Sequence, residues 1–155
     1  MPDIRRATPD DWSDLRAVRL RALADAPYAF ASNLAREQPL PDSHWRSWPT
    51  RHAVFLGWSA DRAVGVAAGM PGDVAGLISV WAAPETRGTE LATGLIAAVV
   101  EWARESGSSR VNAWVVENNP RAIRFYDRLG FTRTGETMAF PNDPTVTEYE
   151  LTLAL

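Results

Sequence analysis

Residues 118–131, NNPRAIRFYDRLGF, are the part of the chain that decides the fold. Asn119 followed by Pro120 is a helix-start signal, because Asn caps free backbone N–H groups and Pro suits the first helical position. Gly130 is the residue type that commonly ends a helix. The stretch therefore predicts a helix from Pro120 to Leu129 and a strand from Phe131. The side chains that share one face of this helix are Ala122, Ile123, Tyr126 and Leu129.

A second informative stretch is PETRGTELATGL, residues 84–95, which joins an apolar run to a helix-periodic one. A helix N-terminus has unpaired N–H groups and the positive end of the helix dipole, so it can hold a phosphate. Gly88 would let a ligand approach the backbone, and Arg87 would add a positive charge. The sequence contains neither a Walker loop nor a dinucleotide fingerprint. By itself the stretch leaves an anion site and an ordinary strand–helix connection open.

Hydrophobic periodicity places the remaining elements around these two stretches. We expect strands at 4–7, 53–60, 63–70, 74–82, 110–116, from 131 and at 146–154. We expect helices at 9–26, at 43–48 with Pro49 as its end, at 88–105 and at 120–129. Residues 27–42 and 140–145 are expected to be irregular. This order, without linker or repeat, predicts one α+β domain over residues 1–155, with a mixed central β-sheet flanked by helices.

The composition is that of a soluble globular protein, since 46% of the 155 residues are hydrophobic and 23% are charged. The net charge of −3 argues against a nucleic-acid partner, which requires a surplus of basic residues. The chain has no cysteine, which excludes disulfides and cysteine-ligated metals. Its N-terminus has no signal-peptide core, and the longest apolar segment, 91–100, is too short to span a bilayer. We therefore expect a cytoplasmic protein without a membrane partner.

Together the two stretches resemble the two central motifs of the GNAT superfamily of N-acetyltransferases. Residues 84–92 match P-E-x-R-G-x-x-x-A, and residues 119–131 match the more specific N-x-x-A-x-x-x-Y-x-x-x-G-F. The expected order of elements is also that of the family, so the resemblance covers most of the chain. It implies the acyl-CoA N-acyltransferase fold of bacterial members, with acetyl-CoA as co-substrate and no metal.

The resemblance also implies which residues bind acetyl-CoA. The end of one strand would separate from its parallel neighbour at a bulge and pair with the pantetheine arm: Val80, Trp81 and Ala82. The backbone amides of the following turn would hold the pyrophosphate: Arg87, Gly88, Thr89, Glu90, Leu91, Ala92 and Thr93. Asn119 would bind the pantetheine or order the site, and Tyr126 would lie near the thioester sulfur, with Ala122 and Phe125 on the same surface.

Glu90 departs from the family pattern, because it occupies a glycine position. Its charge is favourable at a helix N-terminus. Close to a pyrophosphate it would weaken binding by roughly 1–3 kcal/mol. We expect weakened but retained acetyl-CoA binding, and tighter binding in Glu90→Gly.

The implied reaction is direct attack of a primary amine on the thioester, with Tyr126 as general acid for the leaving thiolate. Some family members carry a glutamate base on the strand before the second motif. The matching residue here is Trp114, which cannot accept a proton. The base is therefore open between Glu117, Glu37, His44 and a chain of waters. For Glu117 and Glu37 a solvated surface position is the simpler interpretation, and for His44 a partly exposed one.

The acceptor side is implied only by analogy with the family. Its walls would include Tyr28, Phe30, Asn33, Trp45, Trp114 and Glu117, together with the 140–141 loop. Trp45 and Trp48 could instead pack in the core. The acceptor would be the amine of a small molecule or a peptide, and the protein a monomer or a homodimer. A non-catalytic acyl-CoA sensor is the competing interpretation, which the missing base and Glu90 favour.

Overall fold

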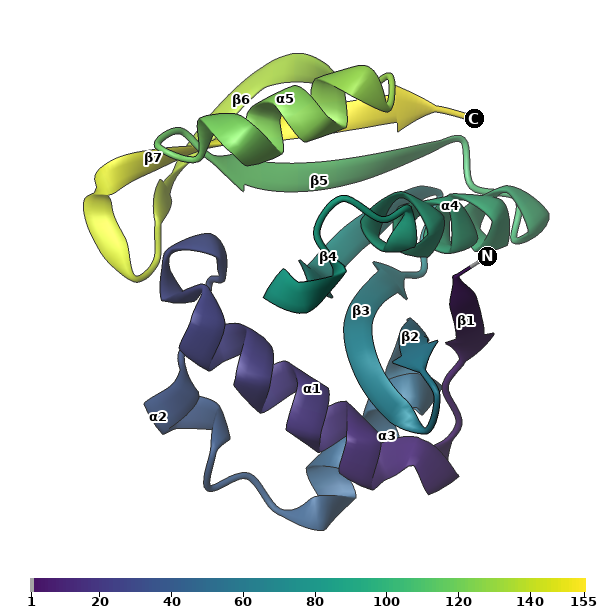
Figure 1. Cartoon of the computed structure of the whole chain (residues 1–155). Helices are drawn as coiled ribbons and strands as arrows, with labels where there is room; N and C mark the ends of the chain where they lie inside the picture. The colour runs from purple at the N-terminus through teal and green to yellow at the C-terminus, as the bar shows by residue number, and fades with distance from the viewer. Residues whose placement is uncertain (1) are drawn as a thin grey trace.

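The computed structural model describes residues 2–155, in which seven strands form one sheet (Figure 1). The strand order is β1-β2-β3-β4-β5-β7-β6, and every neighbouring pair is antiparallel except the parallel pair β4–β5. The strands are β1 (Asp3–Arg6), β2 (Ala53–Ser59), β3 (Arg62–Met70), β4 (Val74–Ala82), β5 (Arg110–Val116), β6 (Thr132–Phe140) and β7 (Asp143–Ala154). This mixed sheet confirms the expected fold class.

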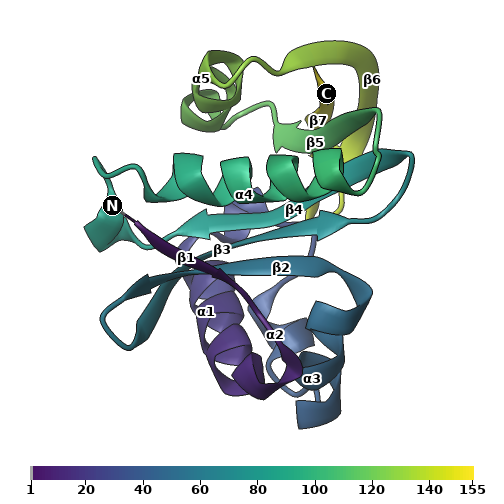
Figure 2. The ribbon, with the colours of Figure 1, turned by 90° about the vertical axis from the view of Figure 1, so that its right-hand side faces the viewer.

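Helices cover both faces of the sheet, as Figure 2 shows. One face carries α1 (Trp12–Asp25), α2 (Leu34–Glu37) and α3 (Asp42–Arg51), and the opposite face carries α4 (Leu91–Glu105) and α5 (Pro120–Arg128). Short 3-10 turns lie at Pro9–Asp11, Pro27–Ala29 and Pro84–Thr86. Among residues 2–155, no helix is long and apolar enough to cross a membrane.

The central parallel pair is short and then opens. β4 and β5 pair only at residues 74–76 of β4, although both strands continue well beyond that point. Ser79 has a φ of 58°, and the β3–β4 register shifts opposite it, between Val66 and Ala68. Such a bulge bends a strand away from its neighbour. The expected separation is confirmed, and it leaves the backbone of β4 without a strand partner on that side.

Two glycines of β3 let α4 pack closely on the sheet. A Cβ atom at Gly65 would come within 2.9 Å of the Leu95 side chain, and one at Gly69 would overlap the ring of Trp102. Leu91, at the start of the helix, is also buried, at 5% exposed. The first turn of α4 is therefore held against the sheet, and this contact positions the loop that precedes it.

Three expected helix boundaries differ from the observed ones by three residues. The helix expected from Pro9 opens with a 3-10 turn at Pro9–Asp11, and α1 itself begins at Trp12. The helix expected to end at Pro49 continues to Arg51, and Trp48 O still accepts the His52 N–H at 3.0 Å. A proline this close to the end removes few helical hydrogen bonds, which is why the helix tolerates it. The helix expected from Gly88 begins at Leu91, because Gly88 has a φ of 82° and is not helical.

The two segments expected to be irregular contain regular structure. Residues 27–42 include α2, and Asn33 caps this helix by accepting the Arg36 N–H at 2.9 Å. In 140–145 only Pro141 and Asn142 lie outside β6 and β7, so the segment is a tight hairpin turn. The Asn33 cap is a local sequence signal from which α2 could have been predicted. The early start of β7 could not, because it results from pairing with β6.

Candidate active site

A cleft of about 490 Å³ lies where β4 and β5 separate. Its walls come from the end of β4, the turn and first residues of α4, the end of β5, α5, and the segment after α1. The residues predicted to bind acetyl-CoA that line it are Val80, Trp81, Ala82, Arg87, Gly88, Thr89, Ala92, Thr93, Asn119, Ala122, Phe125 and Tyr126. From the predicted acceptor side, Tyr28, Phe30 and Trp114 line it too.

The turn before α4 forms one end of this cleft. Gly88 needs to be glycine for its positive φ rather than for space, since an added Cβ would meet nothing within 4 Å. The Thr89 hydroxyl accepts the Leu91 N–H at 3.3 Å. Glu85 forms an ion pair with Arg21 of α1 at 2.6 Å, which ties the turn to the helices on the other face of the sheet. The turn is thereby braced at the N-terminus of α4, where backbone N–H groups can face an anion.

Asn119 and Tyr126 are presented to the cleft by α5. The Asn119 side chain accepts the Ala122 N–H at 3.2 Å, which confirms the predicted cap and leaves its NH₂ group as a donor. Tyr126 is half-buried, and its ring meets Phe131 edge-on with centroids 5.3 Å apart. Burial raises the pKa of Tyr126 to about 12, so its hydroxyl is protonated at neutral pH.

Glu90 and Leu91 are predicted site residues that do not line the cleft. Glu90 is exposed at the N-cap position of α4, consistent with a carboxylate that reaches solvent. The side chain of Leu91 is in the core, so only its backbone is available to a ligand at the turn.

Three residues predicted for the acceptor side also lie outside the cleft. Asn33 lines a second cavity, beside the β6–β7 turn, and Glu117 is exposed with Tyr149 donating to it at 3.5 Å. Trp45 is 1% exposed, so core packing, the alternative left open for it, is correct. Trp45 also lines a third cavity, between the helical layer and β4.

Sequence reasoning missed several residues of the cleft wall: Asp25, Ala26, Ala29, Thr86, Val115, Val116, Arg121 and Arg128. Arg121 and Arg128 had a readable signal, because they are two helical turns apart and so lie on one side of α5. Asp25 had none. Its carboxylate accepts the Trp81 indole N–H at 3.0 Å, a contact between α1 and β4.

Glu37 is not the solvated carboxylate that the sequence favoured. It is only 9% exposed and accepts two hydrogen bonds from one edge of the Arg19 guanidinium, from Nε at 3.0 Å and from Nη2 at 2.9 Å. Burial alone would raise the pKa of Glu37, but hydrogen bonds from Arg19 and Ser32 and the positive charges nearby lower it. A carboxylate held in this way is a poor proton acceptor. His44 is half-buried, and burial lowers its pKa.

Glu148 is a carboxylate that the sequence did not single out. It is 7% exposed, and burial raises its pKa. It pairs in register with Val116, which lines the cleft, so both side chains lie on the same face of the sheet. Within residues 2–155, no group of three or more His, Asp or Glu side chains is arranged to hold a metal ion.

The β6–β7 turn is fastened to the segment that follows α1. The Asn142 side chain donates to Phe30 O at 2.7 Å and to Ser32 O at 2.8 Å. Phe30 lines the cleft. The two segments expected to wall the acceptor side are therefore joined by one amide group.

Comparison with known proteins agrees with this architecture. Residues 17–131 match the model of the acetyltransferase (GNAT) family. A mycothiol acetyltransferase of Thermobispora bispora is 32% identical over 122 residues, which are 76% of this chain and 41% of that protein. The chain spans less than half the length of the curated relatives it matches.

Solved structures share the fold at low sequence identity. The ribosomal-protein-alanine N-acetyltransferase of Brucella melitensis has a TM-score of 0.78 and 21% identity, with 99% of each chain covered. The yncA protein of Salmonella typhimurium, solved with its cofactor acetyl-CoA, has a TM-score of 0.78 and 20% identity, with 100% of this chain and 94% of that chain covered. With most of its length matched by the family model and its sheet shared with these structures, the chain belongs to the acetyltransferase (GNAT) family.

Proposed function

We propose that this chain is an acetyl-CoA-dependent N-acetyltransferase that acetylates a primary amine of a small molecule or a peptide. The observation that carries the proposal is the cleft between the separated ends of β4 and β5, with the turn of α4 at one end and Tyr126 in its wall. Family membership supports it. So do the acetyl-CoA in the Salmonella typhimurium structure and the acetyltransferase name of the Thermobispora bispora relative.

The cleft residues fit acetyl-CoA, which supplies an acetyl group as a thioester. The free backbone of 80–82 would pair with the amide groups of the pantetheine arm. The N–H groups of the α4 turn would hold the pyrophosphate. Arg87, Arg121 and Arg128, all exposed at the cleft wall, would add positive charge around the phosphates.

Catalysis would rest on alignment and on hydrogen-bond donors. A backbone N–H of the β4 bulge would donate to the thioester oxygen, a contact whose loss typically costs about 3–4 kcal/mol of activation. The amine nitrogen forms a bond to the acetyl carbon, the C–S bond breaks, and the surplus amine proton leaves to a base or to water. The Tyr126 hydroxyl would donate to the departing sulfur.

The acidity of Tyr126 limits what this donation contributes. Its pKa of about 12 lies above the ~8.5 of a solvated thiol. Burial against the same wall would also raise the pKa of the leaving thiol, which brings the two closer. Tyr126 therefore assists as general acid by stabilising negative charge on sulfur, and the thiolate can still leave without it.

The proposal includes one catalytic domain over residues 1–155, without a metal, in a cytoplasmic monomer or homodimer. The continuous seven-stranded sheet supports the single domain. Light scattering after size-exclusion chromatography measures the oligomeric state.

The test is a two-step assay. Acetyl-CoA binding is measured by calorimetry, and thiol release is then followed with a panel of primary amines. Binding together with thiol release on at least one amine supports the proposal. Binding without turnover on any amine would indicate an acyl-CoA sensor, and the absence of binding would rule out both functions.

A further inference from the structure

The third cavity has a volume of about 470 Å³ and lies between the helical layer and β4. It is separate from the acetyl-CoA cleft but adjoins it. Ser79 lines the third cavity, and Val80, the next residue of the β4 bulge, lines the cleft. Phe30 lines the cleft, and the guanidinium of Arg19, a residue of the third cavity, lies 5.2 Å from its ring centroid. The two cavities therefore meet at the strand segment where the thioester carbonyl would be bound.

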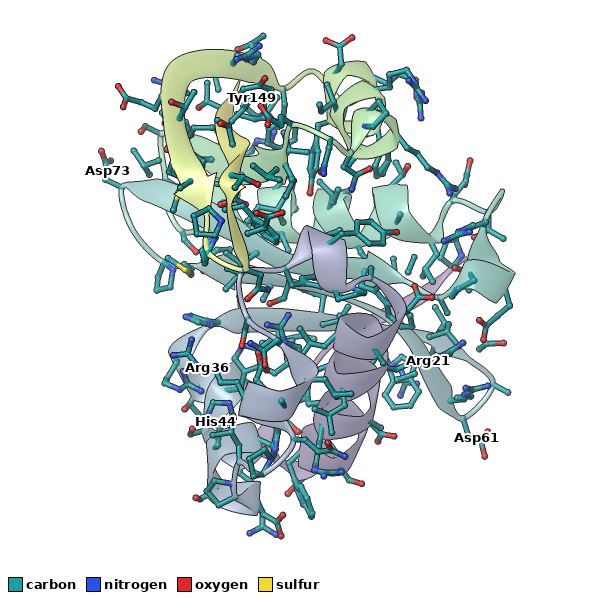
Figure 3. The ribbon with its side chains drawn as sticks, turned by 90° about the vertical axis from the view of Figure 1, so that its left-hand side faces the viewer. Arg21, Arg36, His44, Asp61, Asp73 and Tyr149 are labelled. Atoms are coloured by element: carbon teal, nitrogen blue, oxygen red, sulfur yellow. The ribbon has the colours of Figure 1, made fainter. Side chains whose placement is uncertain are left out.

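The charges around the third cavity do not cancel. Three arginines and one glutamate line it, and the glutamate, Glu37, is already neutralised by Arg19. The other two arginines, Arg36 and Arg51, are exposed and have no acidic partner within residues 2–155. Figure 3 shows Arg36 and His44 close together at the edge of the helical layer. A protein of net charge −3 thus has a local positive site here.

The two histidines of the cavity do not add to this charge at neutral pH. Burial first, and then the positive charge of Arg51, lower the pKa of His52 and of His44. The Trp48 indole N–H donates to His52 Nδ1 at 3.2 Å, which uses that nitrogen as an acceptor. The excess positive charge therefore belongs to Arg36 and Arg51.

The remaining wall is apolar and aromatic. The half-buried side chains of Leu40 and Ile78 line the cavity, together with Trp45 and Trp48, which are buried in the core and have ring centroids 6.3 Å apart. Such a wall binds a hydrocarbon or aromatic group by removing it from water. The combination of free guanidinium groups and this wall suits a carboxylate attached to an apolar or aromatic body, since a guanidinium matches a carboxylate with paired hydrogen bonds.

We propose that the third cavity is the specificity site for the acceptor, and that the acceptor is a primary amine whose other end carries a carboxylate on an apolar or aromatic body. Arg36 and Arg51 bind the carboxylate, the half-buried side chains of Leu40 and Ile78 contact the body, and the amine points to the β4 bulge at Ser79 and Val80. This inference rests on the proposed acetyltransferase function, because that function supplies the reaction at the bulge.

The first experiment measures binding without catalysis. Phenylacetate and phenylacetamide have the same size and ring, and differ in the carboxylate. We expect phenylacetate to bind the protein about tenfold more tightly than the amide, measured by ligand-detected NMR at low salt. Arg36→Gln and Arg51→Gln should each remove most of this preference. Arg46→Gln is the matched control, because Arg46 is exposed on the same helix as Arg51 and lines none of the three cavities.

The second experiment uses the reaction. Acetylation of 4-(aminomethyl)phenylacetate is compared with that of its carboxamide, whose amine is the same. The acid should have a kcat/KM about tenfold higher, and Arg51→Gln should lower kcat/KM for the acid more than for the amide, so that the ratio between the two falls toward one.

The outcomes separate this inference from the proposed function. Equal binding of phenylacetate and phenylacetamide, or an unchanged preference in both arginine variants, overturns the third cavity as a carboxylate site even when acetyl-CoA binds normally. Failure to bind acetyl-CoA, measured on the same samples, contradicts the acetyltransferase proposal and leaves the phenylacetate result to be judged separately. Thermal melting of each variant verifies that the fold is retained.

Discussion

The guanidinium of Arg19 donates two hydrogen bonds to the carboxylate of Glu37, at 3.0 and 2.9 Å, and both side chains are nearly buried. A third hydrogen bond reaches the Ser79 hydroxyl at 3.3 Å. Arg19 therefore links α1 to α2 and to the bulge of β4. The bulge that opens the cleft is therefore held in place by a buried ion pair between α1 and α2, which lie on the face of the sheet away from α4 (Figure 2).

Loss of this ion pair is expected to destabilise the protein. Glu37→Gln leaves the Arg19 charge buried without its counter-ion, and removal of one partner of such a pair costs about 3 kcal/mol. Urea unfolding at neutral pH measures the change. Glu101→Gln is the control, because its ion pair with Arg104 is exposed and is worth less than about 1 kcal/mol.

The same pair predicts a pH dependence. The pKa of Glu37 is lower in the folded protein than its ordinary value of 4.5. Its contribution to stability is therefore complete above pH 4.5 and is lost as the pH falls through the folded-state pKa. The difference between the parent and Glu37→Gln should be constant near neutral pH and shrink below pH 4.5. A difference that grows with acidification would contradict this assignment.

Glu148 is expected to behave in the opposite way. Burial raises its pKa above 4.5, so the folded state holds the proton more tightly than the unfolded state. The ionised side chain then lowers stability as the pH rises from 4.5 through the folded-state pKa. Glu148→Gln should melt at a higher temperature than the parent at neutral pH, with no such gain at pH 4.5 or below. A less stable variant at neutral pH would show that the carboxylate is stabilised by partners.

Tyr126→Phe tests the proposed general acid. Loss of the hydroxyl should lower kcat by roughly 10²–10⁴-fold, while the Kd for acetyl-CoA stays within about twofold. Because burial raises the pKa of Tyr126 to about 12, the parent should show no loss of activity from ionisation of this group up to roughly pH 10. Steady-state rates across this range measure both effects. Unchanged turnover in Tyr126→Phe would remove the residue from the mechanism.

Glu90 is expected to oppose acetyl-CoA binding, though weakly, because its carboxylate is exposed. Glu90→Gly and Glu90→Gln should each bind acetyl-CoA about fivefold more tightly at low salt, and the gain should fade at about 1 M salt. Calorimetry at the two salt concentrations measures this. Glu105→Gln, at the other end of α4, should change nothing. Equal or poorer affinity in both Glu90 variants would refute the expected repulsion.

Asn142→Ala should loosen the acceptor side without affecting the cofactor side. Two hydrogen bonds are lost, to Phe30 O and Ser32 O, at a cost of about 1–2 kcal/mol. We expect a higher KM for the amine and an unchanged Kd for acetyl-CoA. Asn142→Asp, which has the same size but places a carboxylate against two carbonyl oxygens, should be at least as impaired. A normal amine KM in both variants would show that this amide does not position the acceptor side.

Local patterns were sufficient for most of the fold. The Asn-Pro start and Gly end of α5, and the apolar periodicity of α4, act within a few residues, so the sequence alone located these helices. The motif at 119–131 was enough to indicate the family. Its residues Asn119 and Tyr126 line one cleft with the turn of α4, and their roles there remain proposals.

The tertiary structure decided the environment of each charged or polar group. No residue pattern near Glu37 in the sequence predicts its burial. It is buried because α1 brings Arg19 to it. Asn142 contacts a carbonyl 112 residues away. Caps and periodicity depend on neighbours along the chain, whereas burial and pKa depend on which side chains the sheet brings together. The sequence by itself therefore determined the family and the order of elements, and only the assembled sheet decided which carboxylate is neutralised and where an acceptor could bind.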